Sequence, residues 1–129
     1  MSVAVVAAII QDGDRFLVTR RQAGVHLEGL WEFPGGKIDA SETHEAALRR
    51  EIREELDSDI EIGELVLATT HAYSDNSVTL YFYRGTLAGP PRPLLGQEMR
   101  WVSRTDLMAL EFPPADRELL RILTQTEAR

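Results

Sequence analysis

The chain has 129 residues, a length that fits one folded domain, and 43% of them are hydrophobic, enough to form an interior. The absence of cysteine excludes disulfides, thiolate metal sites and cysteine nucleophiles. A formal net charge of −7 disfavours general nucleic-acid binding and suits a protein that collects divalent cations. No apolar run reaches the roughly 20 residues of a membrane span, and the N-terminus lacks the charged n-region that is typical of a signal peptide. We therefore expect a single domain over residues 1–129 in the cytoplasm.

The N-terminal third is predicted to form a β-hairpin followed by loops. Residues 3–10 are apolar and β-branched, which is typical of a buried strand. The Asp-Gly pair that follows predicts a tight turn, with residues 15–19 as the returning strand. Residues 22–32 show no periodicity and are predicted to form a loop. The Pro-Gly-Gly sequence within residues 33–37 predicts a turn where the backbone can approach a ligand closely.

The remainder of the chain alternates helical and strand patterns. Thr43 is a predicted N-cap for a helix that runs to Leu56, with Leu48 and Ile52 on its buried side. Helices interspersed among hairpins predict an α/β fold with a mixed or antiparallel sheet. The other predicted elements are strands at 60–73, 78–87 and 99–103 and helices at 104–110 and 116–124.

Three glutamates, Glu51, Glu54 and Glu55, lie on the predicted helix. At about 100° per residue they share one side of it, next to the buried stripe that contains Ile52. Their mutual repulsion is expected to be offset by a hard divalent cation, Mg²⁺ or Mn²⁺, which prefers oxygen ligands. An exposed helix face, on which the glutamates pair with arginines four positions away, is an equally good interpretation of the helix alone.

The residues before the helix extend this pattern. Gly36 is followed after five residues by Glu42, and after seven more by Arg50-Glu51-Ile52, one residue and Glu54-Glu55. This spacing resembles the Nudix box, the loop-helix-loop signature of the Nudix hydrolases, here at residues 36–58. Seven of its nine defining positions match. Asp57 and Ser58 replace the usual glycine and aliphatic residue, which implies a weaker helix end.

The resemblance extends to the MutT-like branch through the segments at residues 5–10, 19–21, 31–37, 100–102 and 112–116. It implies an α/β/α sandwich around a mixed sheet. It also implies Mg²⁺-dependent hydrolysis of a nucleoside triphosphate, 8-oxo-dGTP or a cytidine triphosphate with or without a methyl group, to a monophosphate and pyrophosphate.

Carried over residue by residue, the resemblance implies the roles of the box. The Gly35 carbonyl, Glu51, Glu54 and Glu55 should hold the divalent ions, with Mg²⁺ expected and Mn²⁺ as an alternative. Arg50 should orient these carboxylates. Leu95 stands where related proteins often carry a glutamate, so the general base is expected to be Glu54 or Glu51. Glu98 could instead reach in from a shifted loop, or be an ordinary exposed residue.

The resemblance also places seven residues at the substrate. Arg21 and Lys37 are candidates for binding phosphates or the sugar. Alternatively, Arg21 could lie at an exposed strand end, and Lys37 could form a salt bridge within the box. The ionised carboxylate of Asp116 only accepts hydrogen bonds, which suits guanine or cytosine, whereas a protonated one can also donate. Asp116 could also be only an N-cap. The other base-site candidates are His26, Phe33, Tyr73 and Asn76. Equally, His26 could be an exposed loop residue, Phe33 and Tyr73 core residues, and Asn76 only a turn residue.

Two other functions compete with this prediction. One is a Nudix hydrolase of ADP-ribose or dinucleoside polyphosphates, whose usual additional markers are not evident. The other is a non-catalytic nucleotide-binding module, although such modules typically lose the box glutamates that are present here. The expected partner is a small nucleotide rather than nucleic acid or membrane, and the protein is expected to be a monomer or a homodimer.

Overall fold

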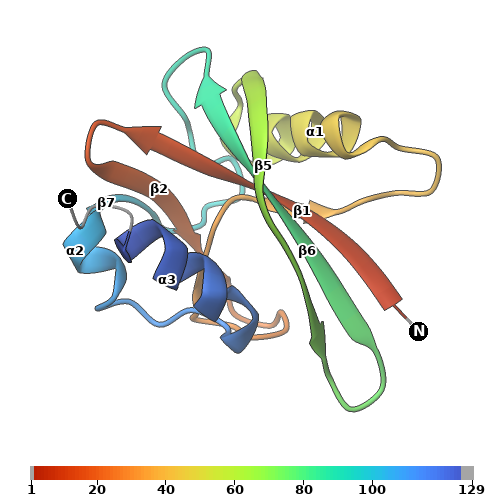
Figure 1. Ribbon diagram of the computed structural model, residues 1–129. Coiled ribbons are helices and arrows are strands. Elements are labelled where there is room, and N and C mark those ends of the chain that lie inside the picture. Colours follow the sequence, from red (N-terminus) through yellow and green to blue (C-terminus); the bar gives the residue numbers. More distant parts are fainter. Residues whose placement is uncertain (1, 126–129) are drawn as a thin grey trace.

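The strand β1 (Ser2–Asp12) organises the sheet, because it pairs with three other strands. In the computed structural model, which describes residues 2–125, β1 runs parallel to β6 over nine residue pairs and antiparallel to β2 and β4 (Figure 1). The parallel pair makes the sheet mixed, as predicted. The strands are β1, β2 (Arg15–Arg20), β3 (Trp31–Glu32), β4 (Gly35–Lys37), β5 (Ile60–Ala72), β6 (Ser77–Leu87) and β7 (Met99–Ser103), in the order β3-β2-β1-β6-β5 with β4 on β1 and β7 on β2.

Helices cover both faces of this sheet. The alternation of β1 sends Val6, Ala8 and Ile10 to the face covered by α1 (His44–Leu56), and Ala7 and Ile9 to the opposite face. That second face is covered by α2 (Arg104–Leu107), the 3₁₀ turn η1 (Pro114–Asp116) and α3 (Arg117–Gln125), which lie together in Figure 1. The predicted α/β/α sandwich is confirmed.

Two short strands differ from the prediction of loop and turn. β3 and β4 have two and three residues, too few to show a periodicity, and only their partners on β2 and β1 fix them as strands. A side chain at Gly35 would place its Cβ 2.0 Å from the Val6 carbonyl oxygen, so this pairing requires glycine. The Pro-Gly-Gly sequence therefore predicted the close approach correctly but not the strand.

The two C-terminal helices also differ in their bounds. α2 ends at Leu107 rather than at residue 110, because the N–H groups of Ala109 and Leu110 bond carbonyls three residues back in tighter turns. The last helix is preceded by η1, so Asp116 lies in a 3₁₀ turn and not in α3 itself. Within residues 2–125, no helix is long and apolar enough to cross a bilayer.

Candidate active site

α1 carries the glutamates, and both of its ends follow the sequence pattern. The Thr43 hydroxyl accepts a hydrogen bond from the Ala46 N–H at 3.0 Å, as expected of an N-cap. At the other end Asp57 has left-handed backbone angles (φ 55°, ψ 44°), and its N–H donates to the Arg53 carbonyl. Ile60 is buried in the core on the α1 side, so it supplies an apolar contact shortly after the helix, where Ser58 cannot.

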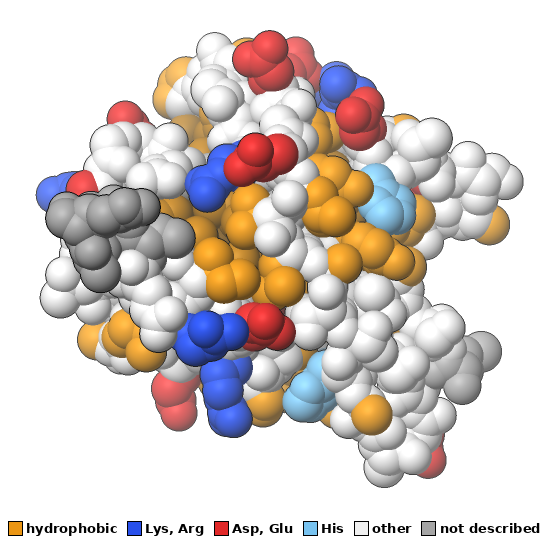
Figure 2. All heavy atoms as spheres, in the orientation of Figure 1, with side chains coloured by type: hydrophobic (Ala, Val, Ile, Leu, Met, Phe, Trp, Pro, Cys, Tyr) orange, Lys and Arg blue, Asp and Glu red, His pale blue; other side chains and the backbone are white. Residues whose placement is uncertain are grey.

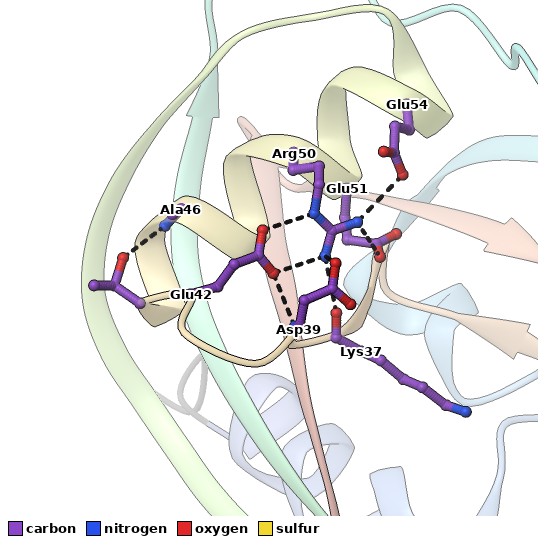
Figure 3. A network of polar contacts seen from close by, with 8 residues as sticks. Lys37, Asp39, Glu42, Ala46, Arg50, Glu51 and Glu54 are labelled. Atoms are coloured by element: carbon purple, nitrogen blue, oxygen red, sulfur yellow. Dashed lines mark hydrogen bonds and ion pairs between the residues drawn. The ribbon is translucent and has the colours of Figure 1, made fainter.

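Arg50 lies at the centre of the polar network shown in Figure 3. Its guanidinium donates to both carboxylate oxygens of Glu42, at 2.7 and 2.9 Å, and to the Lys37 carbonyl at 3.1 Å. It also donates to Glu51 at 3.1 Å and to Glu54 at 3.4 Å. The hydrogen bond to Glu42 raises the pKa of Arg50, and it lowers the pKa of Glu42 to about 2. Arg50 thus joins the loop to the helix and restrains two of the predicted metal ligands.

The three helix glutamates lie in different surroundings. Glu51 and Glu55 line a cavity, and their carboxylates are hydrogen-bonded to each other. Burial first, and then the hydrogen bond and charge of Glu51, raise the pKa of Glu55 to about 9, so the pair holds a proton at neutral pH. The side chain of Glu54 is 58% exposed and contacts Arg50. Helix geometry explains the difference, because Glu54 lies about 160° from Ile52 and Glu55 only about 60°.

Gly35 and Gly36 bring the backbone against these carboxylates. A Cβ on Gly36 would lie 2.4 Å from the carboxyl carbon of Glu51, so glycine is what leaves room for this group. The Gly35 N–H donates to Glu55. Among residues 2–125, no three His, Asp or Glu side chains converge as a metal site. Two of the predicted side-chain ligands, Glu51 and Glu55, meet beside Gly35, and Glu54 does not join them in this structure.

The cavity itself has a volume of about 810 Å³. One wall is apolar and comes from side chains of β1 and β6, among them Val5, Leu80 and Phe82. Other lining residues come from the loop before β3 and from η1. Every residue that the sequence placed at the substrate lines this cavity: Arg21, His26, Phe33, Lys37, Tyr73, Asn76 and Asp116.

Arg21 and its partner Glu32 form an ion pair in the cavity wall. Arg21 Nη1 donates to Glu32 Oε1 at 2.8 Å, and Arg21 Nε donates to the carbonyl of His26. Burial raises the pKa of Glu32, against the opposing charge of Arg21. The sequence placed Arg21 at the phosphates or sugar and assigned no role to Glu32. The only signal for Glu32 was its place in the Trp-Glu-Phe-Pro-Gly-Gly-Lys segment. Lys37 forms no ion pair with any described residue, so the alternative of a salt bridge within the box is not realised.

Asp116 lies in the part of the cavity formed by η1. It is only 5% exposed, and its carboxylate has no hydrogen-bond partner within the described chain. Burial, with a smaller effect from the charge of Glu32, raises the pKa of Asp116 to about 7. Nearby, the rings of His26 and Tyr73 meet edge to face at 5.8 Å. The interpretation of Asp116 as merely an N-cap has no supporting side-chain hydrogen bond.

Phe33 and Asn76 also have structural roles. Phe33 is 4% exposed and stacks on Phe112 with ring centroids 5.5 Å apart, so it belongs to the core as well as to the cavity wall. The Asn76 carbonyl accepts a hydrogen bond from the Tyr73 N–H at 2.7 Å and thereby closes the turn between β5 and β6. For each residue, both interpretations made from the sequence are compatible with its position: core or base site for Phe33, and turn or base site for Asn76.

Comparison with known proteins agrees with this geometry. A family model for the NUDIX domain matches residues 5–121. The chain belongs to the Nudix family. It is 34% identical to the 8-oxo-dGTP diphosphatase of Escherichia coli over 116 residues, which cover 89% of this chain and 90% of that protein. It is also 34% identical to the CTP pyrophosphohydrolase of E. coli over 123 residues, 92% of this chain and 88% of that one. The solution structure of MutT from Staphylococcus aureus superposes with a TM-score of 0.80 at 35% identity, covering 98% of both chains.

The loop that often supplies a further glutamate in Nudix proteins is directed elsewhere here. Leu95 is 54% exposed, and its carbonyl accepts a hydrogen bond from Gln22. The side chain of Gln97 donates to the Glu55 carbonyl at 3.1 Å and accepts from the Leu95 N–H at 2.9 Å. This loop is therefore held against the end of α1.

Glu98 does not take the place of the missing glutamate. Its carboxylate forms ion pairs with Arg20 at 3.2 Å and Arg100 at 3.0 Å, and these arginines lower its pKa. It does not line the cavity. Of the two positions expected for Glu98, the exposed one is found, and its side chain binds surface arginines.

The surface of this Nudix domain offers no broad basic area on the face shown in Figure 2. Hydrophobic side chains form a central patch there, and charged side chains of both signs are scattered around it. Together with the net charge of −7, this distribution does not favour a polyanion as the ligand on this face.

Proposed function

We propose that this Nudix hydrolase is a Mg²⁺-dependent nucleoside triphosphate pyrophosphohydrolase that releases a nucleoside monophosphate and pyrophosphate. One observation carries the proposal: a single cavity joins a pair of metal-type carboxylates, Glu51 and Glu55, to a buried hydrogen-bond acceptor, Asp116. The first group suits phosphates bound through a cation, and the second suits a nucleobase. The similarity to an 8-oxo-dGTP diphosphatase and a CTP pyrophosphohydrolase supports this division of the cavity.

The residues around Glu55 fit a hard divalent cation. Glu55 and Glu51 are buried against each other and keep a proton between them, which relieves the repulsion of their two carboxylates. A cation in place of that proton would relieve the same repulsion with both carboxylates ionised. We assign Glu51, Glu55, Glu54 and the Gly35 carbonyl as the residues that would hold Mg²⁺, with Mn²⁺ as an alternative. When bound, the ion neutralises phosphate charge and lowers the pKa of the attacking water.

The protein's own groups would then position and deprotonate that water. Leu95 has no acid function and Glu98 is bound to surface arginines, so the base is assigned to the box, to Glu54 or Glu51. Arg50 contacts both carboxylates, at 3.4 and 3.1 Å, and would fix their orientation. This role is one of positioning, because Arg50 acts through the glutamates.

At the other end of the cavity, Asp116 would bind the nucleobase. With a pKa of about 7, its carboxylate accepts hydrogen bonds when ionised, which suits guanine N1–H and N2–H₂, the N7–H of oxidised guanine, or the exocyclic amine of cytosine. Lys37, whose ammonium has no ion-pair partner in the described part of the chain, would bind phosphate. A cytoplasmic enzyme, monomer or homodimer, that removes damaged or modified nucleotides before DNA synthesis would fit these features.

The test is a panel of substrates with Mg²⁺: 8-oxo-dGTP, dGTP, dCTP, 5-methyl-dCTP, CTP, ADP-ribose and a dinucleoside polyphosphate. It uses the wild type, Glu54→Gln and a control, Glu45→Gln, which removes the same charge from an exposed position on the same helix. We expect monophosphate and pyrophosphate from a triphosphate, lost only in Glu54→Gln. Nucleotide binding without turnover of any compound would overturn the proposal and favour a non-catalytic module, for which Leu95 would be the reason.

A further inference from the structure

Glu32 is a cavity residue for which neither the sequence pattern nor the proposed reaction has a use. It lies in β3 opposite Thr19, and its side chain is 30% exposed. The cavity that Glu32 lines also contains Glu55 and Asp116. The Trp31 N–H bonds the Glu111 carbonyl just before η1, and the Gly35 N–H donates to Glu55. The segment that carries Glu32 therefore leads from the Asp116 end of the cavity to the Glu55 end.

The carboxylate of Glu32 is held in place through one of its two oxygens. Arg21 Nη1 donates to its Oε1 atom at 2.8 Å, and Arg21 is in turn fixed by the carbonyl of His26. The Oε2 atom of Glu32 has no hydrogen-bond or ion-pair partner in residues 2–125. Since Glu32 lines the cavity, this oxygen is an oriented acceptor available to a ligand.

The chemistry of a nucleotide decides which of its groups meets this acceptor. With the phosphates at Glu51 and Glu55 and the base at Asp116, the sugar occupies the segment between them, beside Glu32. Phosphate oxygens are anionic acceptors and would be repelled by a carboxylate. Sugar hydroxyls are neutral donors and would pair with it.

We propose that Glu32 is a specificity-determining residue that accepts a hydrogen bond from a hydroxyl of the substrate sugar, with Arg21 as its positioning residue. The inference rests on the proposed function, since it uses the proposed placement of phosphates and base. It gives Arg21 a different role from the phosphate contact expected from the sequence, because two of its donors are already committed to Glu32 and to the loop.

The experiment removes the hydroxyl from the substrate and the carboxylate from the protein separately. The kcat/KM of wild type, Glu32→Ala and Glu64→Ala is measured on the ribo, 2′-deoxy, 3′-deoxy and 2′,3′-dideoxy forms of the triphosphate whose base the substrate panel selects. Glu64 is an exposed glutamate of β5 that pairs with Arg84 and lies outside the cavity, so Glu64→Ala controls for the loss of charge. The affinities of the corresponding monophosphates, measured by calorimetry, provide a readout independent of catalysis.

We expect the wild type and Glu64→Ala to discriminate roughly 10- to 100-fold against the analogue that lacks the contacted hydroxyl, as for a hydrogen bond to a charged acceptor. In Glu32→Ala this ratio should approach one, in both kcat/KM and monophosphate affinity. Partial loss of fold lowers all rates alike and leaves the ratio unchanged, so the ratio separates recognition from structural damage. The 2′- and 3′-deoxy forms identify which hydroxyl is bound.

An unchanged ratio in Glu32→Ala, with turnover intact in the wild type, would overturn the assignment to Glu32 and leave the proposed function standing. If the wild type itself does not discriminate between substrates with and without the hydroxyl, the assignment to Glu32 is likewise overturned and the proposed function stands. If the wild type hydrolyses none of the triphosphates in the substrate panel, 8-oxo-dGTP included, and binds none of their monophosphates, the proposed function fails and the inference fails with it.

Discussion

Replacement of Gly36 by alanine tests whether the Glu51 carboxylate is held where the reaction needs it. The new Cβ would lie 2.4 Å from the carboxyl carbon of Glu51 and 2.5 and 2.6 Å from its oxygens. Ordinary contacts are about 3.5–4.0 Å, so the carboxylate must retreat by about 1 Å. A displacement of that size at a reacting centre costs about 100-fold in rate, or about 2.7 kcal/mol. We therefore expect Gly36→Ala to lower kcat/KM about 100-fold.

Stability should change much less than activity, because the displaced atoms are the end of a flexible side chain. We expect the free energy of unfolding in urea to stay within about 1 kcal/mol of the wild type. Two matched substitutions set the scale. Gly63→Ala meets Arg84 only at ordinary contact distances of 3.5–3.6 Å and should alter neither quantity. Gly35→Ala collides with the backbone of Val6 and should unfold the protein.

The assay is kcat/KM on the substrate identified by the panel, together with urea unfolding of all three variants. A folded Gly36→Ala protein within about threefold of the wild-type kcat/KM would refute the reasoning, because the position of Glu51 would then not limit the rate. Loss of activity in Gly63→Ala would also refute it, since that change lies far from Glu51 and outside the cavity.

Three further changes have defined outcomes. An acid whose pKa is raised in the folded state destabilises the protein above its unfolded pKa. Asp116→Asn should therefore raise the free energy of unfolding relative to the wild type, progressively from about pH 4 to 7 and by a few kcal/mol above pH 7. A difference between variant and wild type in urea that is equal at pH 4 and pH 8 would contradict this. Asp57→Gly should stabilise by about 1 kcal/mol at unchanged kcat/KM, because glycine adopts the left-handed helix end without steric cost; a lower thermal midpoint would count against it. Glu98→Ala should retain wild-type kcat/KM, because its carboxylate binds Arg20 and Arg100 outside the cavity; a 100-fold loss would make it the base after all.

Local sequence determined the helix that carries the chemistry. The Thr43 cap, the apolar stripe through Ile52 and the spacing of Arg50 and the glutamates act within a few turns of chain, so α1 was predicted with its observed bounds. Helical periodicity also placed Glu55 closer than Glu54 to the buried stripe. The long strands β5 and β6 were predicted to within one residue at each end, because their patterns extend over more than ten residues.

Contacts distant in sequence decided the rest. β3 and β4 exist because β2 and β1 pair with them, and two or three residues carry no pattern of their own. The Glu32–Arg21 pair spans eleven positions, and its importance depends on a cavity assembled from β1, β6 and the segment before α3. The direction of Glu98 was likewise set by Arg20, 78 positions away. The sequence by itself thus determined the family, the sandwich and the box helix, whose signals are local. Only the tertiary structure decided which carboxylates face the cavity and which are bound at the surface, because burial and partner depend on segments far apart in the chain.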